Sequence, residues 1–167
     1  LTFGASHVPI ASLPGAFERT VTISSGGKTF STTGWKVGWA IAPAPILQAI
    51  VAVKQYLTYV NGAPFQPAIA VGLGLPDSYF AAAAASLQKK RDILTAGLSR
   101  AGFGVGIPDA GYFVIADAAD LGVTDAAEFA RALPALAGVV AVPVTAFVKA
   151  SCNVIFMVTL QLWGLHL

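Results

Sequence analysis

A lysine-bearing stretch from Val21 to Trp39 constrains this chain more than any other part of the sequence. It reads VTISSGGKTFSTTGWKVGW: a β-rich run, a Ser/Gly break, Lys28, a run of hydroxyl residues, and Lys36 between two tryptophans. A strand that feeds a Ser/Gly turn places the next side chain at the edge of a sheet, where the sites of open α/β sheets gather. Two lysines eight residues apart, separated by hydroxyls and small glycines, suit a compact dianion held beside one reactive amine.

Two other interpretations of Lys28 compete with this one. The sequence Gly27-Lys28-Thr29 resembles the end of a phosphate-binding P-loop, G-x-x-x-x-G-K-[ST]. The first glycine of that motif would fall at position 22, which is Thr22, and Gly34 interrupts the helix that should follow. The sequence therefore disfavours a P-loop. A solvated lysine on a surface turn is the usual structural explanation, but it leaves the neighbouring glycines and hydroxyls unexplained.

Composition limits the function further. Only 11% of the residues are charged, 56% are hydrophobic, and the mean hydropathy is +0.72, which is unusually apolar for a soluble monomer. Such a balance fits a subunit that hides much of its surface in an oligomer, or a piece of a larger protein. The net charge of +2 comes without a cluster of Lys or Arg, so we expect no nucleic-acid partner.

The uncharged stretches are better explained as buried elements than as membrane spans. Glycines and prolines interrupt residues 55–76, and residues 151–165 fall short of the roughly 20 residues that cross a bilayer. We therefore expect no membrane partner. The single cysteine, Cys152, permits no internal disulfide, and no signal peptide is visible before residue 10, which favours a cytoplasmic location.

Hydrophobic periodicity and turn residues predict alternating strands and helices, which is an α/β fold. Residues 78–101 read as one long amphipathic helix, and Asp125 followed by Glu128 reads as a capping box for a helix ending near Leu136. A proline at the first helical position opens a helix near Pro45. The other predicted elements are strands at 37–42, 112–116 and 138–144, a helix at 65–75 and a glycine-rich turn at 102–106.

The lysine stretch resembles the active-site motif of class I/II aminotransferases, the fold-type I enzymes that use pyridoxal 5′-phosphate. The family pattern is S-x-x-K followed by G-x-[RK]-x-G, and this chain has SGGK from Ser25 to Lys28 and GWKVG around Lys36. Most members carry arginine at the position of Lys36. The kynurenine aminotransferase branch, with S-x-G-K-T-F-S-x-T-G-W-K-V-G-W, looks alike in keeping lysine there. Residues 54–67 look like actinobacterial enzymes assigned to succinyl-diaminopimelate transamination.

The resemblance implies roles for three residues, and it implies no metal site. Lys28 matches the lysine that forms a Schiff base with the cofactor, and Ser25 and Lys36 match ligands of the cofactor phosphate. A lysine must lose its proton to act as a nucleophile, which desolvation and nearby positive charge both favour. A phosphate needs cations and hydroxyl donors, and a lysine at position 36 acts as a point charge without the bidentate fork of arginine.

The resemblance also implies how the chain is organised. Residues 1–76 would be the last part of the large cofactor-binding domain, 77–101 a connecting helix, and 102–147 part of the small domain. The N-terminal half of the family fold would be absent, so the chain is expected to be a fragment of the pyridoxal-phosphate transferase fold. The resemblance covers about residues 1–147.

Residues 148–167 depart from the family pattern. Where members carry an arginine that clamps the substrate carboxylate, in R-F-x-F, this chain has Asn153 and then VIFMV, and no arginine follows Arg131. The hydrophobic residues of this tail follow neither a period of two nor one of 3.6. We therefore expect an atypical tail that is poorly integrated into the fold.

The function implied is transfer of an amino group between an amino acid and a 2-oxo acid by an enzyme that is a homodimer when intact. The donor stays open between kynurenine, methionine, succinyl-diaminopimelate and others. Two alternatives remain: a truncated, non-catalytic remnant, which the missing arginine favours, or a C–S lyase of the same fold. A transcription regulator of this fold would need a DNA-binding module, of which the sequence holds no trace.

Overall fold

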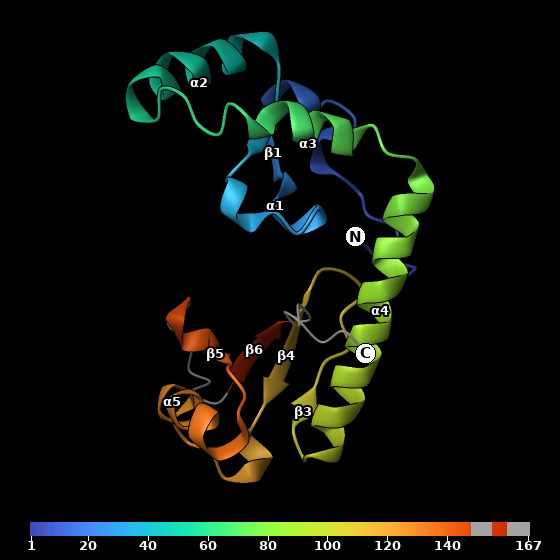
Figure 1. Ribbon diagram of the computed structural model, residues 1–167, viewed down its shortest axis with the longest axis vertical. Helices are drawn as coiled ribbons and strands as arrows, with labels where there is room; N and C mark the ends of the chain where they lie inside the picture. Colours follow the sequence, from blue (N-terminus) through green and yellow to red (C-terminus); the bar gives the residue numbers. More distant parts are fainter. Residues whose placement is uncertain (148–154, 160–167) are drawn as a thin grey trace. The chain divides into compact units, whose positions relative to one another are not determined.

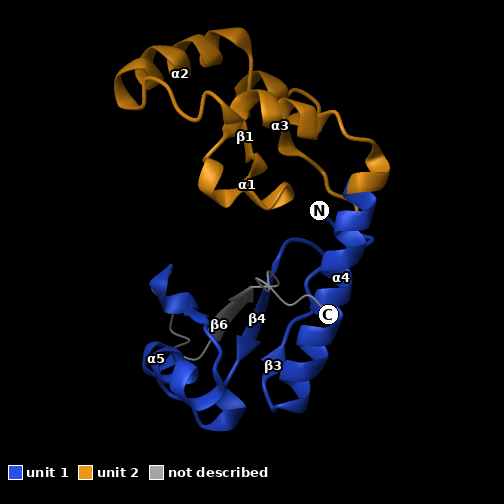
Figure 2. Ribbon diagram, in the orientation of Figure 1, with its two compact units in different colours: residues 1–5, 80–167 blue, residues 6–79 orange. Residues whose placement is uncertain are grey.

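The computed structural model of the protein describes residues 1–147 and the backbone of a strand at 155–159. The chain divides into two compact units, coloured separately in Figure 2. Residues 6–79 form one unit, and residues 1–5 with 80–167 form the other. The boundary falls within the helix α4 (Asp77–Arg100), after Tyr79. The assignment of these parts to a large domain, a connecting helix and a small domain stays a prediction.

The unit of residues 6–79 is built on a two-stranded antiparallel ribbon. Strand β1 (Thr22–Ser25) pairs with β2 (Gly38–Ile41), and Ser25 lies opposite Gly38. The short helix α1 (Gly26–Thr29) and the 3-10 turn η3 (Thr33–Trp35) fill the connection between the two strands. The lysine stretch therefore forms a strand, a helical turn and a returning strand, with both lysines in the connection.

Two further helices complete this unit (Figure 1). Helix α2 (Ala44–Leu57) begins at Ala44, next to Pro45, which was expected to open a helix. Pro43 is its N-cap residue. Helix α3 (Phe65–Leu73) ends two residues before the predicted limit and buries Ile69 against Gly26. In α2 no residue is buried, and four of its large apolar or aromatic side chains are exposed: Val51, Val53, Tyr56 and Leu57.

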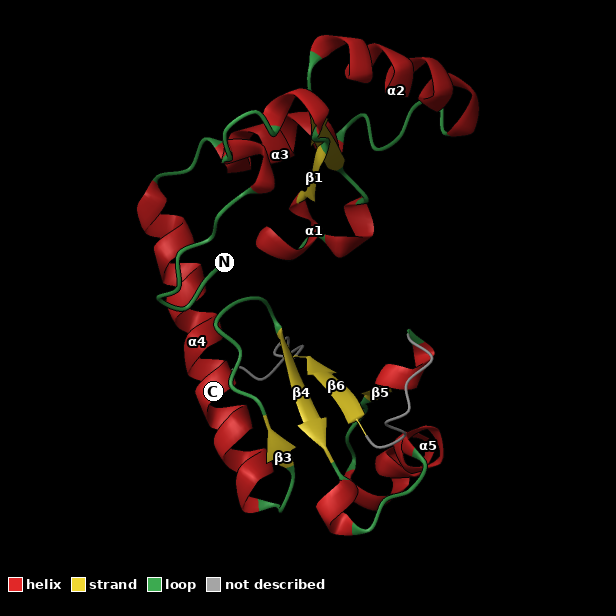
Figure 3. Ribbon diagram, turned by 180° about the vertical axis from the view of Figure 1, so that it is seen from behind, coloured by secondary structure: helices red, strands yellow, loops and turns green. Residues whose placement is uncertain are grey.

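The other unit holds a four-stranded sheet in the order β3-β4-β6-β5, drawn in yellow in Figure 3. Every neighbouring pair is antiparallel. Helix α4 is continuous over 24 residues, which confirms the predicted long helix. Helix α5 lies beside β5 and β6 (Figures 1 and 3). The bounds are β3 Gly104–Val105, β4 Phe113–Asp117, α5 Ala126–Ala137, β5 Val142–Pro143 and β6 Ile155–Thr159.

Small side chains form the core of this unit. Val114, Ala116 and Ala118 at or near β4 are almost wholly buried, as is Ala126 at the start of α5. Ala118 and Ala126 belong to one buried cluster, and five partly buried apolar residues pack against it: Phe103, Val123, Phe129, Ala130 and Ala141. Because alanine adds little bulk, the helix can approach closely to the end of the strand.

Arg91 of α4 contacts the N-terminal segment, residues 1–5, and a later loop of the same unit. Its side chain is 10% exposed, its guanidinium lies 4.8 Å from the ring centre of Phe3, and it donates a 2.9 Å hydrogen bond to the carbonyl of Pro108. A 2.7 Å ion pair with Asp92 balances its charge. The backbone N–H of Phe3 donates to the carbonyl of Asp109 at 2.8 Å. These contacts explain why residues 1–5 group with residues 80 onward.

The expectation that the tail is poorly integrated is wrong for residues 155–159. These residues form β6, which pairs with β4 on one edge and with β5 on the other. The run Ile155-Phe156-Met157-Val158 lacks alternation, but alternation is expected only of a strand with one face in solvent, and its β-branched and aromatic content suits a strand. Residues 148–154 and 160–167, to which the same expectation applied, lie outside the described residues.

Two smaller expectations also need correction. The predicted turn at 102–106 contains the short strand β3, which pairs with the end of β4. The predicted strand at 138–144 is reduced to Val142–Pro143. Gly138 takes a left-handed conformation, with φ 65°, to end α5, so the chain turns before it can extend.

Within the described part of the chain, no single helix is long and apolar enough to cross a membrane. Helices α3 and α4 satisfy that criterion only when taken together, and they are bent by 92° at the break between them.

Replacing Val114 by alanine should destabilise the fold measurably. Val114 is fully buried, whereas its neighbour Ile115 is 44% exposed. Loss of two buried methyl groups and the cavity left behind predict a loss of about 2 kcal/mol in the free energy of unfolding. Urea denaturation of the full chain measures this value, with Ile115→Ala as the matched control. An equal loss in both variants would contradict the placement of the core.

Asp125 should give α5 a pH-dependent contribution to stability. Its carboxylate accepts hydrogen bonds from the backbone N–H groups of Glu128 at 3.0 Å and Ala127 at 2.8 Å, and these bonds hold its pKa below the usual 3.8. Because the folded-state pKa is the lower one, the stabilisation is present above pH 3.8 and is lost as the pH falls through the folded-state value.

Asp125→Ala should therefore lower the melting temperature at pH 7, and the difference from wild type should shrink below about pH 4. The control is Asp120→Ala, which removes an exposed carboxylate of the 3-10 turn Ala119–Leu121 in the same unit. A difference that stays constant from pH 7 to pH 3 would rule out the capping role.

Candidate active site

In the connection from β1 to β2, Lys28 follows the end of the strand after two glycines, Gly26 and Gly27. The strand ends at Ser25, and Lys28 lies inside α1 rather than at the strand tip itself. The backbone N–H of Gly26 donates to the carbonyl of Val37 at 3.1 Å, and that of Thr32 donates to Gly27 at 2.8 Å. These hydrogen bonds fold the connection back on itself, so that its two ends lie together.

Glycine is required where this connection packs most tightly. A Cβ atom added to Gly26 would lie 2.5 Å from the side chain of Ile69 in α3, and one added to Gly27 would lie 3.2 Å from the backbone of Thr33. A side chain at position 26 would force the Ile69 side chain to move, and one at position 27 would require the Thr33 backbone to shift slightly. The two glycines before Lys28 therefore fix where that lysine lies.

One pocket of about 360 Å³ gathers the three residues predicted to form the site. The structure thus brings together Ser25, Lys28 and Lys36, all three exposed to solvent, on the same side of the connection. Of the hydroxyl residues between the lysines, Thr33 also lines the pocket. The remaining lining residues are Gly27 and Val37.

Lys36 reaches this pocket from an unusual backbone conformation. It follows η3 with φ 54° and ψ 37°, a left-handed geometry that a residue with a Cβ atom rarely adopts. The side-chain amide of Asn61 donates a 2.9 Å hydrogen bond to the carbonyl of Lys36. The sequence indicated only a turn around Asn61, because nothing in a local pattern shows a partner 25 residues away.

The residues of the pocket fit a phosphate held beside a reactive amine. Two lysines supply positive charge, Ser25 and Thr33 supply hydroxyl donors, and Gly27 leaves the backbone accessible. Over residues 1–147, no three side chains of His, Cys, Asp or Glu gather in a way that would hold a metal ion. The chemistry available at this site is therefore that of an amine nucleophile and an anion ligand set, and pyridoxal 5′-phosphate has both matching groups.

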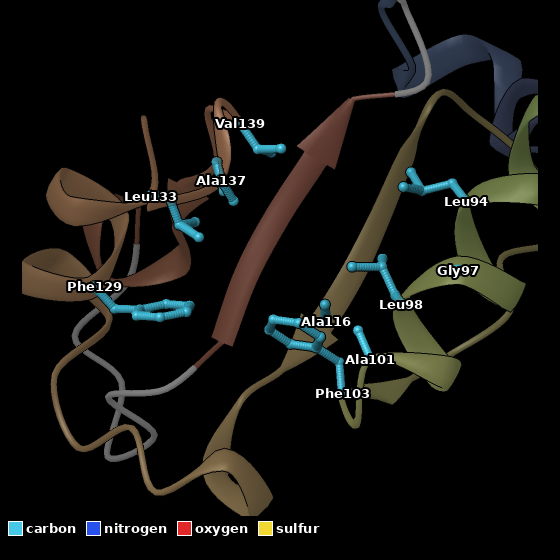
Figure 4. Close-up of a pocket in the computed structure, with 11 residues that line it drawn as sticks. Leu94, Gly97, Leu98, Ala101, Phe103, Ala116, Phe129, Leu133, Ala137 and Val139 are labelled. Carbon is cyan, nitrogen blue, oxygen red and sulfur yellow. The ribbon is translucent and has the colours of Figure 1, made fainter. Parts of the chain in front are cut away.

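A second pocket, of about 270 Å³, lies in the other unit between α4 and α5 (Figure 4). Leu94 and Leu98 of α4 extend toward Phe129 and Leu133 of α5, with Ala116 of β4 between them. Its other lining residues are Gly97, Ala101, Phe103, Ala137, Val139 and Ala141. None of these side chains titrates, so among the described residues this pocket offers no acid, base or nucleophile.

Comparison with known proteins identifies the family of this chain. The model of the family "Aminotransferase class I and II" matches residues 2–157. That match continues past Phe147, where the resemblance was expected to end, and includes part of β6.

Two relatives and one solved structure show the extent of the similarity. The chain is 50% identical over 143 residues to a "Probable N-succinyldiaminopimelate aminotransferase DapC" of Mycobacterium tuberculosis, covering 86% of this chain and 36% of the relative. It is 43% identical over 126 residues to the mouse (Mus musculus) "Kynurenine--oxoglutarate transaminase 3", covering 71% of this chain and 28% of the relative.

The solved structure of N-succinyldiaminopimelate aminotransferase from Mycobacterium tuberculosis superposes with a TM-score of 0.90 at 46% identity. The superposition covers 96% of this chain and 42% of that structure. The chain thus spans about a third of the length of the curated relatives it matches. Its sequence, its two-unit fold and its lysine pocket agree in one assignment: the chain belongs to the class I and II aminotransferase family and contains part of the pyridoxal-phosphate transferase fold.

Proposed function

We propose that this chain carries the cofactor-anchoring segment of an aminotransferase that moves an amino group between an amino acid and a 2-oxo acid. The observation that carries the proposal is the single pocket shared by Lys28, Lys36 and Ser25. Family membership supplies the reaction class. The cofactor would be pyridoxal 5′-phosphate, which when bound supplies the electron sink for chemistry at the substrate carbon.

Each residue of the pocket has a separate task in this proposal. The Lys28 amine would hold the cofactor, and when free it would move the proton of the substrate Cα as general base and acid. Lys36 places a positive charge against the phosphate, and the hydroxyl of Ser25 donates a hydrogen bond to it.

Two alternatives share the same pocket. A truncated, non-catalytic remnant would keep the fold without the reaction, and a C–S lyase would keep the cofactor but break a different bond. The named relatives favour transamination over the lyase. The substrate is proposed at the level of its class, an amino acid and a 2-oxo acid.

A homodimer is the second part of the proposal. Helix α2 and the residues after it expose large apolar side chains: Tyr56 is 86% exposed, Leu57 77%, Tyr59 74% and Val60 68%. A contiguous apolar surface of this kind is typical of a buried interface.

Sedimentation equilibrium should therefore show twice the mass of one chain at micromolar concentration, and replacing Tyr56 and Leu57 together by glutamate should reduce it to one. A matched control replaces Lys89 and Lys90, exposed residues of α4, by glutamate. A wild-type mass of one chain would contradict the interface.

Lys28 should form a covalent adduct with pyridoxal 5′-phosphate that borohydride makes permanent. Mass spectrometry of the full chain should place the added mass on Lys28, and Lys28→Ala should abolish the absorbance of the bound cofactor. Lys54→Ala is the control, because Lys54 lies on α2 and bonds to Thr58 instead of lining the pocket. Labelling spread evenly over surface lysines would favour the non-catalytic remnant.

A further inference from the structure

The loop between α2 and α3 packs directly on the backbone that carries Lys36. The Asn61 amide donates to the Lys36 carbonyl at 2.9 Å, and the Gln66 amide donates to the Asn61 carbonyl at 2.8 Å. Next to these bonds the rings of Trp35 and Phe65 stack with centroids 4.8 Å apart and planes 16° from parallel. Trp35 and Lys36, which are adjacent in the sequence, thus both contact the loop between α2 and α3 and the start of α3.

A glycine allows this loop to come so close. Gly62, which follows Asn61, has φ +55°, and a Cβ atom there would lie 3.2 Å from the carbonyl oxygen of Trp35 and 3.3 Å from the side chain of Val37. A side chain would thus meet the segment on both sides of Lys36. The Asn-Gly pair therefore provides both the donor and the close approach.

These contacts matter because the left-handed backbone conformation of Lys36 is unfavourable by itself. Left-handed backbone places Cβ near the following carbonyl in any residue except glycine, so the surrounding structure must hold it. The Asn61 amide is bonded to the carbonyl of Lys36 itself, at the point where the chain turns from η3 into β2. This turn sets the direction in which the Lys36 side chain leaves the backbone.

We propose that Asn61 is a positioning residue that holds Lys36 in its left-handed conformation and thereby aims the Lys36 amine at an anion in the pocket beside Lys28. The inference rests on the phosphate-binding role proposed above for Lys36. A lysine binds a phosphate as a point charge on a flexible stem, without a rigid fork. Its contribution to affinity depends on how well its backbone is fixed beforehand.

The experiment is a double-mutant cycle on the full chain, with inorganic phosphate as the probe in calorimetric titration. Asn61→Ala should raise the dissociation constant about three- to tenfold, as expected for one lost hydrogen bond. Asn61→Leu, which keeps about the size of the side chain but loses the donor without adding a charge, should raise it as well. Lys36→Ala should raise it at least as much, and Asn61→Ala should then cause no further change.

Ser12→Ala is the matched control. Ser12 also makes an exposed side-chain hydrogen bond to a backbone carbonyl in the same unit, that of Pro9 at 2.7 Å, but it does not line the pocket. Its phosphate affinity should equal that of wild type. The melting temperature of each variant shows whether it is folded, and Asn61→Leu carries the test if Asn61→Ala is not.

Three outcomes would overturn the inference: no measurable phosphate binding by the wild type, unchanged affinity in both Asn61 variants, or an equal loss on Asn61→Ala with and without Lys36. The last would mean that Asn61 merely stabilises the loop. Borohydride trapping separates the two proposals. If the wild type forms no adduct at Lys28 but binds phosphate in the Asn61-dependent way, transamination fails and the positioning role stands.

Discussion

The contact between Gly26 and Ile69 is the constraint on which the lysine pocket depends. Because residue 26 has no side chain, Ile69 of α3 can lie against the junction where β1 becomes α1. That contact keeps α3 beneath the connection, and α3 in turn anchors the loop that reaches Lys36 through Asn61. A larger residue at position 26 would force the Ile69 side chain to move and would disturb the packing of α3 against the connection.

The apolar composition of the chain is explained by apolar surface that the chain does not bury in its own core. Helix α2 buries none of its residues, and the described residues that line the pocket between α4 and α5 are all apolar. The curated relatives are about three times longer than the part that this chain matches, so their fold has further surfaces with which such elements can pack. A mean hydropathy of +0.72 is unusual for a soluble monomer, but it suits a chain with so much apolar surface outside its own core.

Local sequence signals predicted the elements that depend on local physics. The long helix α4, the Asp125 cap of α5 and the strand–turn character before Lys28 follow from periodicity, capping and turn residues within a few positions. The strand β6 was missed because its lack of alternation was taken as evidence against a strand, although its partners β4 and β5 are what define it. Asn61 was missed for the same physical reason, since its partner is distant in sequence.

In the proposed site, lysine stands at position 36, where the motif that the chain resembles most often has arginine, and a lysine there depends more on the surrounding backbone. An arginine carries its own rigid geometry for binding phosphate, so its backbone can vary within limits. A lysine presents one charge at the end of four rotatable bonds, and its entropy is lost on binding unless the backbone already directs it. The left-handed Lys36, the amide of Asn61 and the stacked Trp35 and Phe65 together restrict that backbone. In this chain the directionality absent from the side chain is thus supplied by the loop before α3.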